Sequence, residues 1–557
     1  MRFSLAVCAS KHSHTFRLCA LSVLNGVFTP MKNAILLEAF VLLFASLWAF
    51  YEHIHTATTS SILWTLQFPL QTLAFGAFSI IFHPQTLTRE RDTEDSGWMA
   101  GVLLPPLALI SRQIVEGTSD IVFLAYAHCS LYIGLCILLN RLGRSNGLFR
   151  ICISLLFLLN GPFRDITAFL PFIAWKIFSK VLAFGLGILR RSITLGEGIL
   201  IAQGFTFFLI DFLLLVSARI SNSFLLLRAV NTRDNVARMS EVALFGGLLI
   251  AWCLSPLSKQ QIRDRPPSIS KCIGRICMAI VGVLCICRVL LSTWNPFQWL
   301  VSFLHSFRLI VLFFWILLLI LCLPLFQWIA VKIRQIIARK LFHGLVVVMF
   351  FPVALMDTQM LCLSYSIAIT LFILTECVRV VSIQKLGATQ ITAFMSIFVD
   401  HREAGSIVLT HTYLLLGCAL PLWLSYDPMD SKNIQFVLPP HAGILALGIG
   451  DAMGAVIGSL YGRPRACIGF KSVEGTLAVF LSISLASIFI LRLYAVPSIR
   501  QVRQVFDRYD TFSFSVQILR VLLASGLTSV FEATSSQIDN LTLPLLLFTL
   551  LNLASTS

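Results

Sequence analysis

The sequence predicts an all-α protein that crosses a membrane many times. Hydrophobic residues make up 57% of the 557-residue chain and charged residues only 12%, whereas a soluble domain averages about 25% charged residues. Apolar runs of the length needed to span lipid, roughly 17 to 25 residues, recur along the whole chain. These runs are continuous rather than alternating, which excludes a transmembrane β-barrel.

The apolar runs predict a polytopic membrane protein with about 14 to 17 transmembrane helices. The expected spans lie near residues 34–51, 61–82, 97–112, 119–139, 151–163, 166–188, 196–217, 240–257, 272–292, 297–330 (two spans), 341–357, 360–378, 404–426, 436–460, 473–494, 515–533 and 541–555.

The formal net charge of +16 fits the cytosolic loops of such a protein, which carry an excess of Lys and Arg. Residues 332–340 hold four basic residues and no acid, so we expect them in the cytosol. Counting spans from there places residues 461–476 and Asp539 on the cytosolic side as well, and residues 427–433 in the lumen. No soluble stretch is long enough to offer a basic face to nucleic acid, so no nucleic-acid partner is expected.

The most informative segment is the glycine-rich stretch 448–476, which places Asp451 inside an apolar run and basic residues directly after it. A charged group within a bilayer costs roughly 2.5 kcal/mol or more on insertion scales, so it marks a functional-site candidate. Glycine-rich backbone beside Lys and Arg can cradle phosphates, and carboxylates suit Mg²⁺. The alternative is a glycine-rich packing helix followed by an ordinary positive loop.

The residue types in this segment predict phosphoryl-transfer chemistry. Asp451 suits a metal ligand or a base that accepts a proton from a hydroxyl group. Glu474 is a second candidate metal ligand, although it also suits the first turn of a helix beginning near Ser472. The segment lacks the Gly-Lys-Ser/Thr spacing of a Walker A motif, so an ordinary P-loop ATPase is not expected.

Several motifs together resemble the dolichol kinases, CTP-dependent polyprenol kinases of the endoplasmic reticulum. The strongest match joins Gly450-Asp-Ala, Gly458, Tyr461-Gly462 and Lys471-Ser-Val-Glu-Gly-Thr476. Further matches are residues 339–343, Glu376 with Arg379, residues 410–423, residues 532–544 and, in the first half, residues 194–197. One departure is Phe470, which stands where the family commonly has the first of two consecutive lysines.

The resemblance implies a site that binds CTP on the cytosolic side of the endoplasmic reticulum membrane. Its nucleotide-binding residues would be Tyr461, Gly462, Arg463, Arg465, Gly469, Lys471, Ser472, Glu474, Gly475 and Thr476. Lys471, Arg463 and Arg465 would contact phosphates, and Asp451 and Glu474 would hold Mg²⁺ or another divalent cation. Asp451 would be the base, with Asp539 and His343 as alternatives.

The reaction implied by the resemblance moves the γ-phosphate of CTP to dolichol and yields dolichyl phosphate and CDP. Dolichyl phosphate is the lipid carrier for N-glycosylation, mannosylation and GPI-anchor synthesis. We expect residues 331–557 to form the catalytic membrane domain, and residues 1–330 to form a multispanning region of unclear role. No protein partner is indicated.

The sequence leaves two alternative functions open. The first is another CTP-using lipid enzyme, namely a diacylglycerol kinase or a phosphatidate cytidylyltransferase. The second is a transporter, since many spans and a glycine-broken helix with an intramembrane Asp also suit a substrate site. An inverted repeat of the Asp451 region in the first half would favour the transporter, and the sequence shows none.

Overall fold

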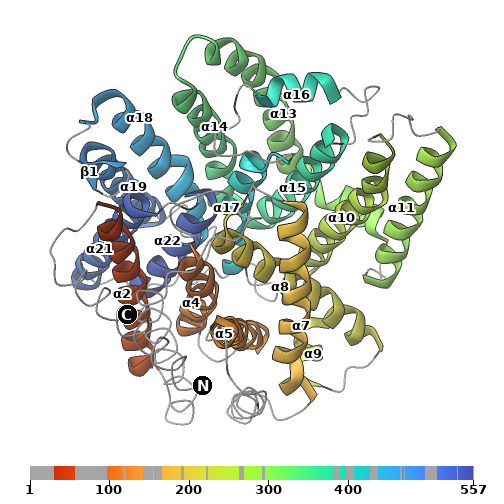
Figure 1. Ribbon diagram of the computed structural model, residues 1–557, viewed down its shortest axis with the longest axis horizontal. Coiled ribbons are helices and arrows are strands. Elements are labelled where there is room, and N and C mark those ends of the chain that lie inside the picture. Colours follow the sequence, from red (N-terminus) through yellow and green to blue (C-terminus); the bar gives the residue numbers. More distant parts are fainter. Residues whose placement is uncertain are drawn as a thin grey trace, which may run out of the picture.

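The computed structural model describes residues 30–56, 97–116, 121–141, 155, 166–189, 193–220, 224–231, 233–261, 269–290, 295–380, 388–396, 398, 407–426, 437–463, 467–468, 471–495, 511–535, 537 and 539–555. Nearly all of these residues are helical (Figure 1). The described part of the chain contains a single pair of short antiparallel strands.

The first half of the chain contributes the helices α2 (Pro30–Thr56), α4 (Trp98–Glu116), α5 (Ile121–Arg141), η2 (Ile166–Phe169), α7 (Leu170–Ile188), α8 (Leu195–Ile220), α9 (Leu225–Asn231), α10 (Asn235–Gln261), α11 (Ile269–Leu290), α12 (Pro296–Phe303) and α13 (Ser306–Ala330). The second half contributes α14 (Gln335–Met356), α15 (Thr358–Val380), α16 (Ala388–Ser396), α17 (Thr410–Ser425), η4 (Pro439–His441), η5 (Ile444–Asp451), α18 (Ala452–Tyr461), β1 (Cys467–Ile468), β2 (Lys471–Ser472), α19 (Val473–Ala495), α21 (Thr511–Thr534) and α22 (Asp539–Ser555).

The prediction of an all-α polytopic membrane protein is confirmed. Among the described residues, 11 helices are long and apolar enough to cross a membrane, judged by length and composition. The expected spans 61–82 and 151–163 lie almost entirely outside the described residues. The run 297–330 forms one span, α13, after the eight-residue helix α12. This run is too short for two spans of about 20 residues each and the turn between them.

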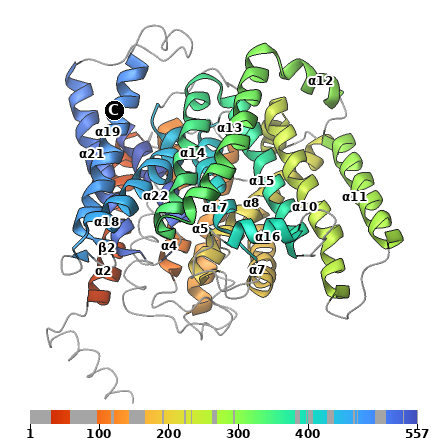
Figure 2. The same cartoon turned by 90° about the horizontal axis from the view of Figure 1, so that it is seen from above.

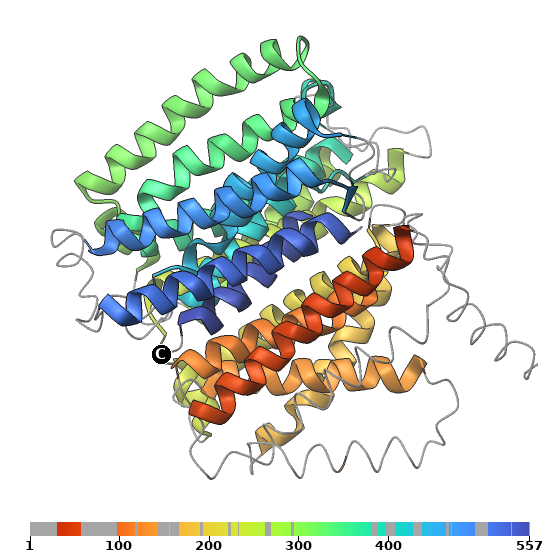
Figure 3. The same ribbon diagram turned by 90° about the vertical axis from the view of Figure 1, so that its left-hand side faces the viewer.

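Helices from the two ends of the chain pack side by side. Figures 1 and 3 show α2 and α4, in red and orange, next to the blue helices α21 and α22. Helix α22 packs against α4, α17 and α21, and it is buried all round from residue 540 to residue 554. Helix α11 lies at one edge of the molecule, opposite α19 and α21 (Figure 2). A helix without a polar face belongs in the interior of a bundle, which explains the central place of α22.

Asp451 stands at the end of a π-helix, η5, that continues directly into α18. Short π-helical segments widen a helix locally and are frequent at functional sites. Glycines let this segment approach its neighbours closely: a Cβ atom on Gly450 would lie 2.8 Å from Cδ1 of Ile483 in α19. The glycines are therefore explained by close helix packing, as the alternative interpretation of the sequence proposed, but that packing does not explain Asp451.

The segment after α18 folds back as a hairpin. Cys467 pairs with Ser472, and Ile468 pairs with Lys471, so β1 and β2 run antiparallel. Ser472 then begins α19, because its hydroxyl accepts a hydrogen bond from the Gly475 N–H group at 3.2 Å. This is the contact of an N-cap serine, and it confirms the helix start expected near Ser472.

Replacing Gly450 by Ala tests the close packing of η5 on α19. The added methyl group overlaps Ile483, and overpacking of this kind costs about 1–3 kcal/mol. We expect Gly450→Ala to lower the apparent melting temperature of the detergent-purified protein, measured by intrinsic tryptophan fluorescence. Gly344→Ala is the matched control, since a Cβ atom on Gly344 of α14 meets nothing within 4 Å. A Gly450→Ala variant as stable as Gly344→Ala would contradict the packing.

Candidate active site

Charged side chains from five separate elements meet beside the β1–β2 hairpin. These elements are α14, η5, β2, the end of α21 and the start of α22, and their ionisable members are Lys340, His343, Asp451, Lys471, Glu532 and Asp539. We call this group the charged cluster. Its members are up to 199 residues apart in the sequence, so only the packing of the bundle brings them together.

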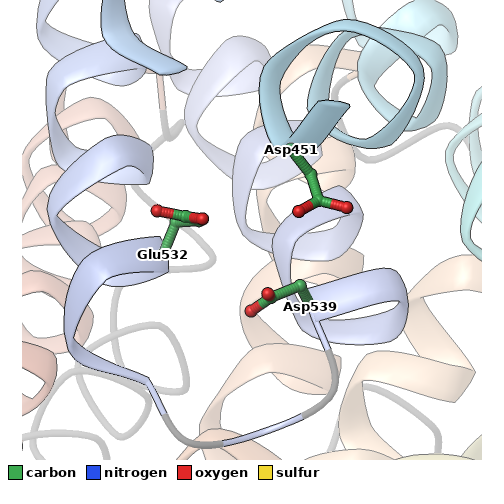
Figure 4. Close-up of side chains that lie close together, drawn as sticks. All are labelled: Asp451, Glu532 and Asp539. Carbon is green, nitrogen blue, oxygen red and sulfur yellow. The ribbon is translucent and has the colours of Figure 1, made fainter. Parts of the chain in front are cut away.

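Three carboxylates form the core of the charged cluster. Asp451, Glu532 and Asp539 can each offer one oxygen such that these oxygens lie within 4.8 Å of one another. Figure 4 shows the three carboxylates facing a common space from three different helical segments. The side chains of Asp451 and Glu532 are only 5% and 2% exposed. Buried like charges this close repel one another strongly, so the arrangement requires positive charge among them.

Two lysines provide part of that positive charge. Lys340 Nζ donates to Asp451 Oδ2 at 2.5 Å. Lys471 Nζ donates to Glu532 and, at 2.8 Å, to Asp539 Oδ2. Burial by itself lowers the pKa of the Lys471 ammonium group, but the carboxylates of Asp539 and Glu532 outweigh this effect and hold its pKa well above the usual lysine value. Lys471 is therefore a permanent cation in this site.

The histidine of the charged cluster lies against Asp451. His343 Nε2 lies 3.2 Å from Asp451 Oδ2, and His343 Nδ1 lies 3.2 Å from the backbone carbonyl of Arg339, one turn earlier in α14. The imidazole is thus held between a main-chain group and the carboxylate. A base that is fixed by a second residue in this way is a recurrent feature of catalytic sites.

The carboxylates keep unused capacity to bind a cation. Glu532 Oε2 and Asp539 Oδ1 are buried without a hydrogen-bond partner, although buried carboxylate oxygens normally have one. Two ammonium groups also leave one of the three carboxylates without a compensating charge. Oxygen donors with a net negative charge are the ligands that Mg²⁺ prefers. The donor set therefore fits a divalent cation.

Four residues that the sequence predicted for catalysis lie together in the charged cluster, namely Asp451, His343, Lys471 and Asp539. Two members had no predicted role. Glu532 opens the motif 532–544, and its place inside a family-like segment is a signal that could have pointed to it. Lys340 lies in the matching segment 339–343, but it was counted only as a loop charge, and nothing in the sequence indicated Asp451 as its partner.

Glu474 lies apart from the charged cluster, in contrast to the pair of metal ligands expected from the sequence. Its carboxylate accepts a hydrogen bond from the Arg463 N–H group at 3.3 Å and lies 3.9 Å from Arg463 Nε. The acids close to Asp451 are Glu532 and Asp539 instead. The physical reason is helical geometry: Glu474 is one residue into α19, and its side chain extends toward the end of α18.

The other described residues that were predicted to bind nucleotide lie at the end of α18, in β2 and in the first turn of α19. Tyr461 is 68% exposed, and the Arg463 side chain is 84% exposed. Ser472, Gly475 and Thr476 form the first turn of α19, where Thr476 Oγ1 donates to the Ser472 carbonyl at 3.1 Å. Gly462 closes α18 through a bond from its N–H group to the Gly458 carbonyl at 3.1 Å. Arg465 and Gly469 lie outside the described residues.

Comparison with known proteins yields curated dolichol kinases from plants, mammals and yeasts. The chain is 30% identical over 383 residues to dolichol kinase EVAN of Arabidopsis thaliana, which covers 64% of each chain. It is 33% identical over 289 residues to human dolichol kinase, covering 49% of this chain and 51% of the human one. It is 32% identical over 216 residues to dolichol kinase sec59 of Schizosaccharomyces pombe, covering 38% of each.

The resemblance to dolichol kinases is thus confirmed, and the chain spans less than two thirds of the length of these curated relatives. No protein-family model matches the chain. No solved structure matches it either.

The electrostatics of Lys471 can be tested by chemical labelling. A raised pKa keeps the ammonium group protonated to higher pH, so less of the reactive neutral amine is present at any pH below it. We expect acetic anhydride at pH 9 to label Lys471 about tenfold or more slowly than the exposed Lys332, measured by mass spectrometry. Asp539→Asn removes one carboxylate without unburying Lys471 and should speed its labelling. Equal labelling of Lys471 in both proteins would contradict the charge pairing.

Proposed function

We propose that the protein is a CTP-dependent dolichol kinase that transfers the γ-phosphate of CTP to the hydroxyl group of dolichol. The observation that carries this proposal is the charged cluster, in which three carboxylates and two lysines converge beside a hairpin and a helix N-terminus. Phosphoryl transfer depends on positioning and charge neutralisation, and these groups suit both tasks. The named relatives support dolichol as the acceptor.

Asp451, Glu532 and Asp539 are the proposed ligands of a divalent cation. The unpaired oxygens of Glu532 and Asp539 and the net negative charge of the cluster support this assignment. Bound there, Mg²⁺ would neutralise charge on the transferred phosphate and on the CDP leaving group. This set replaces the pair of Asp451 and Glu474 expected from the sequence.

Asp451 is the proposed base. It is 5% exposed, whereas Asp539 is 20% exposed, so Asp451 is the acid more shielded from water and better placed for an alcohol that arrives from lipid. Its carboxylate would accept the hydroxyl proton as the dolichol oxygen bonds to the γ-phosphorus and the bond from phosphorus to the bridging oxygen of CDP breaks. His343 and Lys340 would hold the carboxylate in place.

Lys471 is the proposed contact to the transferred phosphate. It belongs to strand β2 of the hairpin, its side chain is 31% exposed, and it is charged throughout the physiological pH range. Arg463 has an exposed guanidinium group that can close over the outer phosphates. The first turn of α19 adds backbone N–H groups and a positive dipole end. The expected second lysine before Lys471 is absent, and Arg463 and Arg465 are its proposed substitutes.

We place the protein in the endoplasmic reticulum membrane with this site facing the cytosol. The basic residues at 332–340 and those of the hairpin region support this orientation, because cytosolic loops carry an excess of Lys and Arg. Both groups lie at the same end of the bundle, where Arg334 donates to the Ser459 carbonyl at 2.7 Å. The cytosol is also where CTP is available.

A diacylglycerol kinase or phosphatidate cytidylyltransferase remains the second candidate, because the charged cluster itself does not select the lipid.

The assay that decides between these candidates uses the full-length protein and γ-labelled CTP with dolichol, diacylglycerol or phosphatidate. We expect label in dolichyl phosphate, and none without a divalent cation, because the carboxylates need it to offset their charge. Chelation with EDTA should abolish transfer, and added Mg²⁺ should restore it. Label only in phosphatidate, or in no lipid, would refute the proposal.

Variants of the acids test the roles within the site. We expect Glu532→Gln to lower the transfer rate about 100-fold or more, the usual scale for losing one charged group that stabilises a transition state. Glu474→Gln is the matched control: it is the same chemical change on an acid outside the charged cluster, and it should lower the rate only a few fold. Lys471→Ala and Asp451→Asn should abolish transfer while expression is retained. Equal effects of the two glutamate variants would overturn the ligand assignment.

A further inference from the structure

Gln537, which lies between α21 and α22, is held by a residue of the first half of the chain. The linker between these two helices joins two members of the charged cluster, Glu532 and Asp539, and it carries the buried side chain of Gln537. Thr194 Oγ1 donates to Gln537 Oε1 at 2.5 Å, and the Thr194 side chain is fully buried. The contact joins residues 343 positions apart in the sequence.

Thr194 is itself fixed by the start of α8. Its hydroxyl accepts a hydrogen bond from the Glu197 N–H group at 3.3 Å, and Glu197 Oε2 accepts one from the Thr194 N–H group at 3.0 Å. This reciprocal pair is a capping box, which fixes the position of the N-cap side chain. The Thr194 hydroxyl thus caps α8 with an oxygen lone pair and uses its hydrogen to hold Gln537.

Two glycines allow the linker and α8 to come this close. Gly97 has a left-handed backbone with φ of +61°, and a Cβ atom on it would overlap the Gln537 side-chain amide. A Cβ atom on Gly196 would overlap the Gly97 backbone. Residues 194–197 resemble the dolichol kinases, and the proposed mechanism leaves them without a role.

We propose that Thr194 is a positioning residue for the metal-binding carboxylates: by holding Gln537 it fixes the linker, and through the linker it sets the separation of Glu532 and Asp539. This inference rests on the proposed function for the identity of the site, but its central claim concerns cation binding. Without the hydroxyl, the buried Gln537 side chain loses this hydrogen bond to α8, so Gln537 is held less firmly between the two carboxylates. Displaced ligands bind a cation more weakly.

The test measures Mn²⁺ binding to the full-length, detergent-purified protein by electron paramagnetic resonance. The variant Asp539→Asn lacks one proposed ligand and gives the background of Mn²⁺ bound elsewhere. Thr194→Val keeps the side-chain shape and removes the hydroxyl. We expect it to raise the Mn²⁺ dissociation constant about tenfold or more, the scale on which residues that orient metal ligands act. The apparent activation constant for Mg²⁺ in the kinase assay should rise in parallel, with the KM for CTP unchanged.

Two controls separate positioning from general damage. Thr194→Ser keeps both the cap and the donor and should bind Mn²⁺ as the wild type does. Thr206→Val makes the same change at a buried threonine of α8 whose hydroxyl donates to the Ala202 carbonyl one turn earlier, and it should also bind normally. If Thr194→Val does not yield monodisperse protein, Gln537→Asn decides in the same titration, because its shorter side chain does not reach Thr194 and leaves the cap of α8 intact.

The results separate this inference from the proposed function. Three results would each overturn the inference. The first is a Mn²⁺ affinity of Thr194→Val, or of Gln537→Asn in its place, within twofold of the wild type. The others are an equal loss of affinity in Thr206→Val and the absence of site-specific Mn²⁺ binding in the wild type. Normal Mn²⁺ binding by the wild type without phosphate transfer from CTP to any lipid would refute the proposed function, while a weakened Thr194→Val would still support the positioning role.

Discussion

The structure of the site depends on positive charges that offset the repulsion among three carboxylates buried close together. Asp451 and Glu532 are nearly inaccessible to water, and both are close to Asp539. Such a group persists only if cations are held against it, because unpaired buried charge is strongly destabilising. Lys340 and Lys471 meet part of this need, and each comes from a different element. Ion pairs between these lysines and carboxylates therefore hold α14, η5, the hairpin, α21 and α22 together at the site.

The same constraint explains the local backbone around the site. A π-helical turn and closely packed glycines bring Asp451 to the centre of the bundle, where an ordinary apolar helix would present only aliphatic side chains. The fully buried helix α22 begins with Asp539, so the positive end of its dipole faces the carboxylates. Its packing against α4 joins the site to the first half of the chain. The half without predicted catalytic residues is thus in direct contact with a helix that carries a residue of the charged cluster.

Sequence reasoning succeeded where the signal is local. The continuous apolar runs predicted the helical membrane fold, and Asp451 and Lys471 stood out as candidates because charge and glycine are rare in such runs. The loop-charge argument also placed Asp539 on the side of Lys471, and the two side chains are hydrogen-bonded. Proximity in sequence does not indicate the partner of Lys471: Glu474 is three residues away but bonds to Arg463. Glu532, 61 residues away, binds Lys471 instead.

By itself the sequence determined the class of the protein, the positions of most spans and the family it resembles, because hydrophobicity and short motifs are properties of contiguous residues. The tertiary structure alone decided which acids face one another, that Lys340 pairs with Asp451, and that Thr194 reaches Gln537. These contacts join residues 111 and 343 positions apart. They follow from how helices pack, and one sequence contains no periodic signal that specifies such partners.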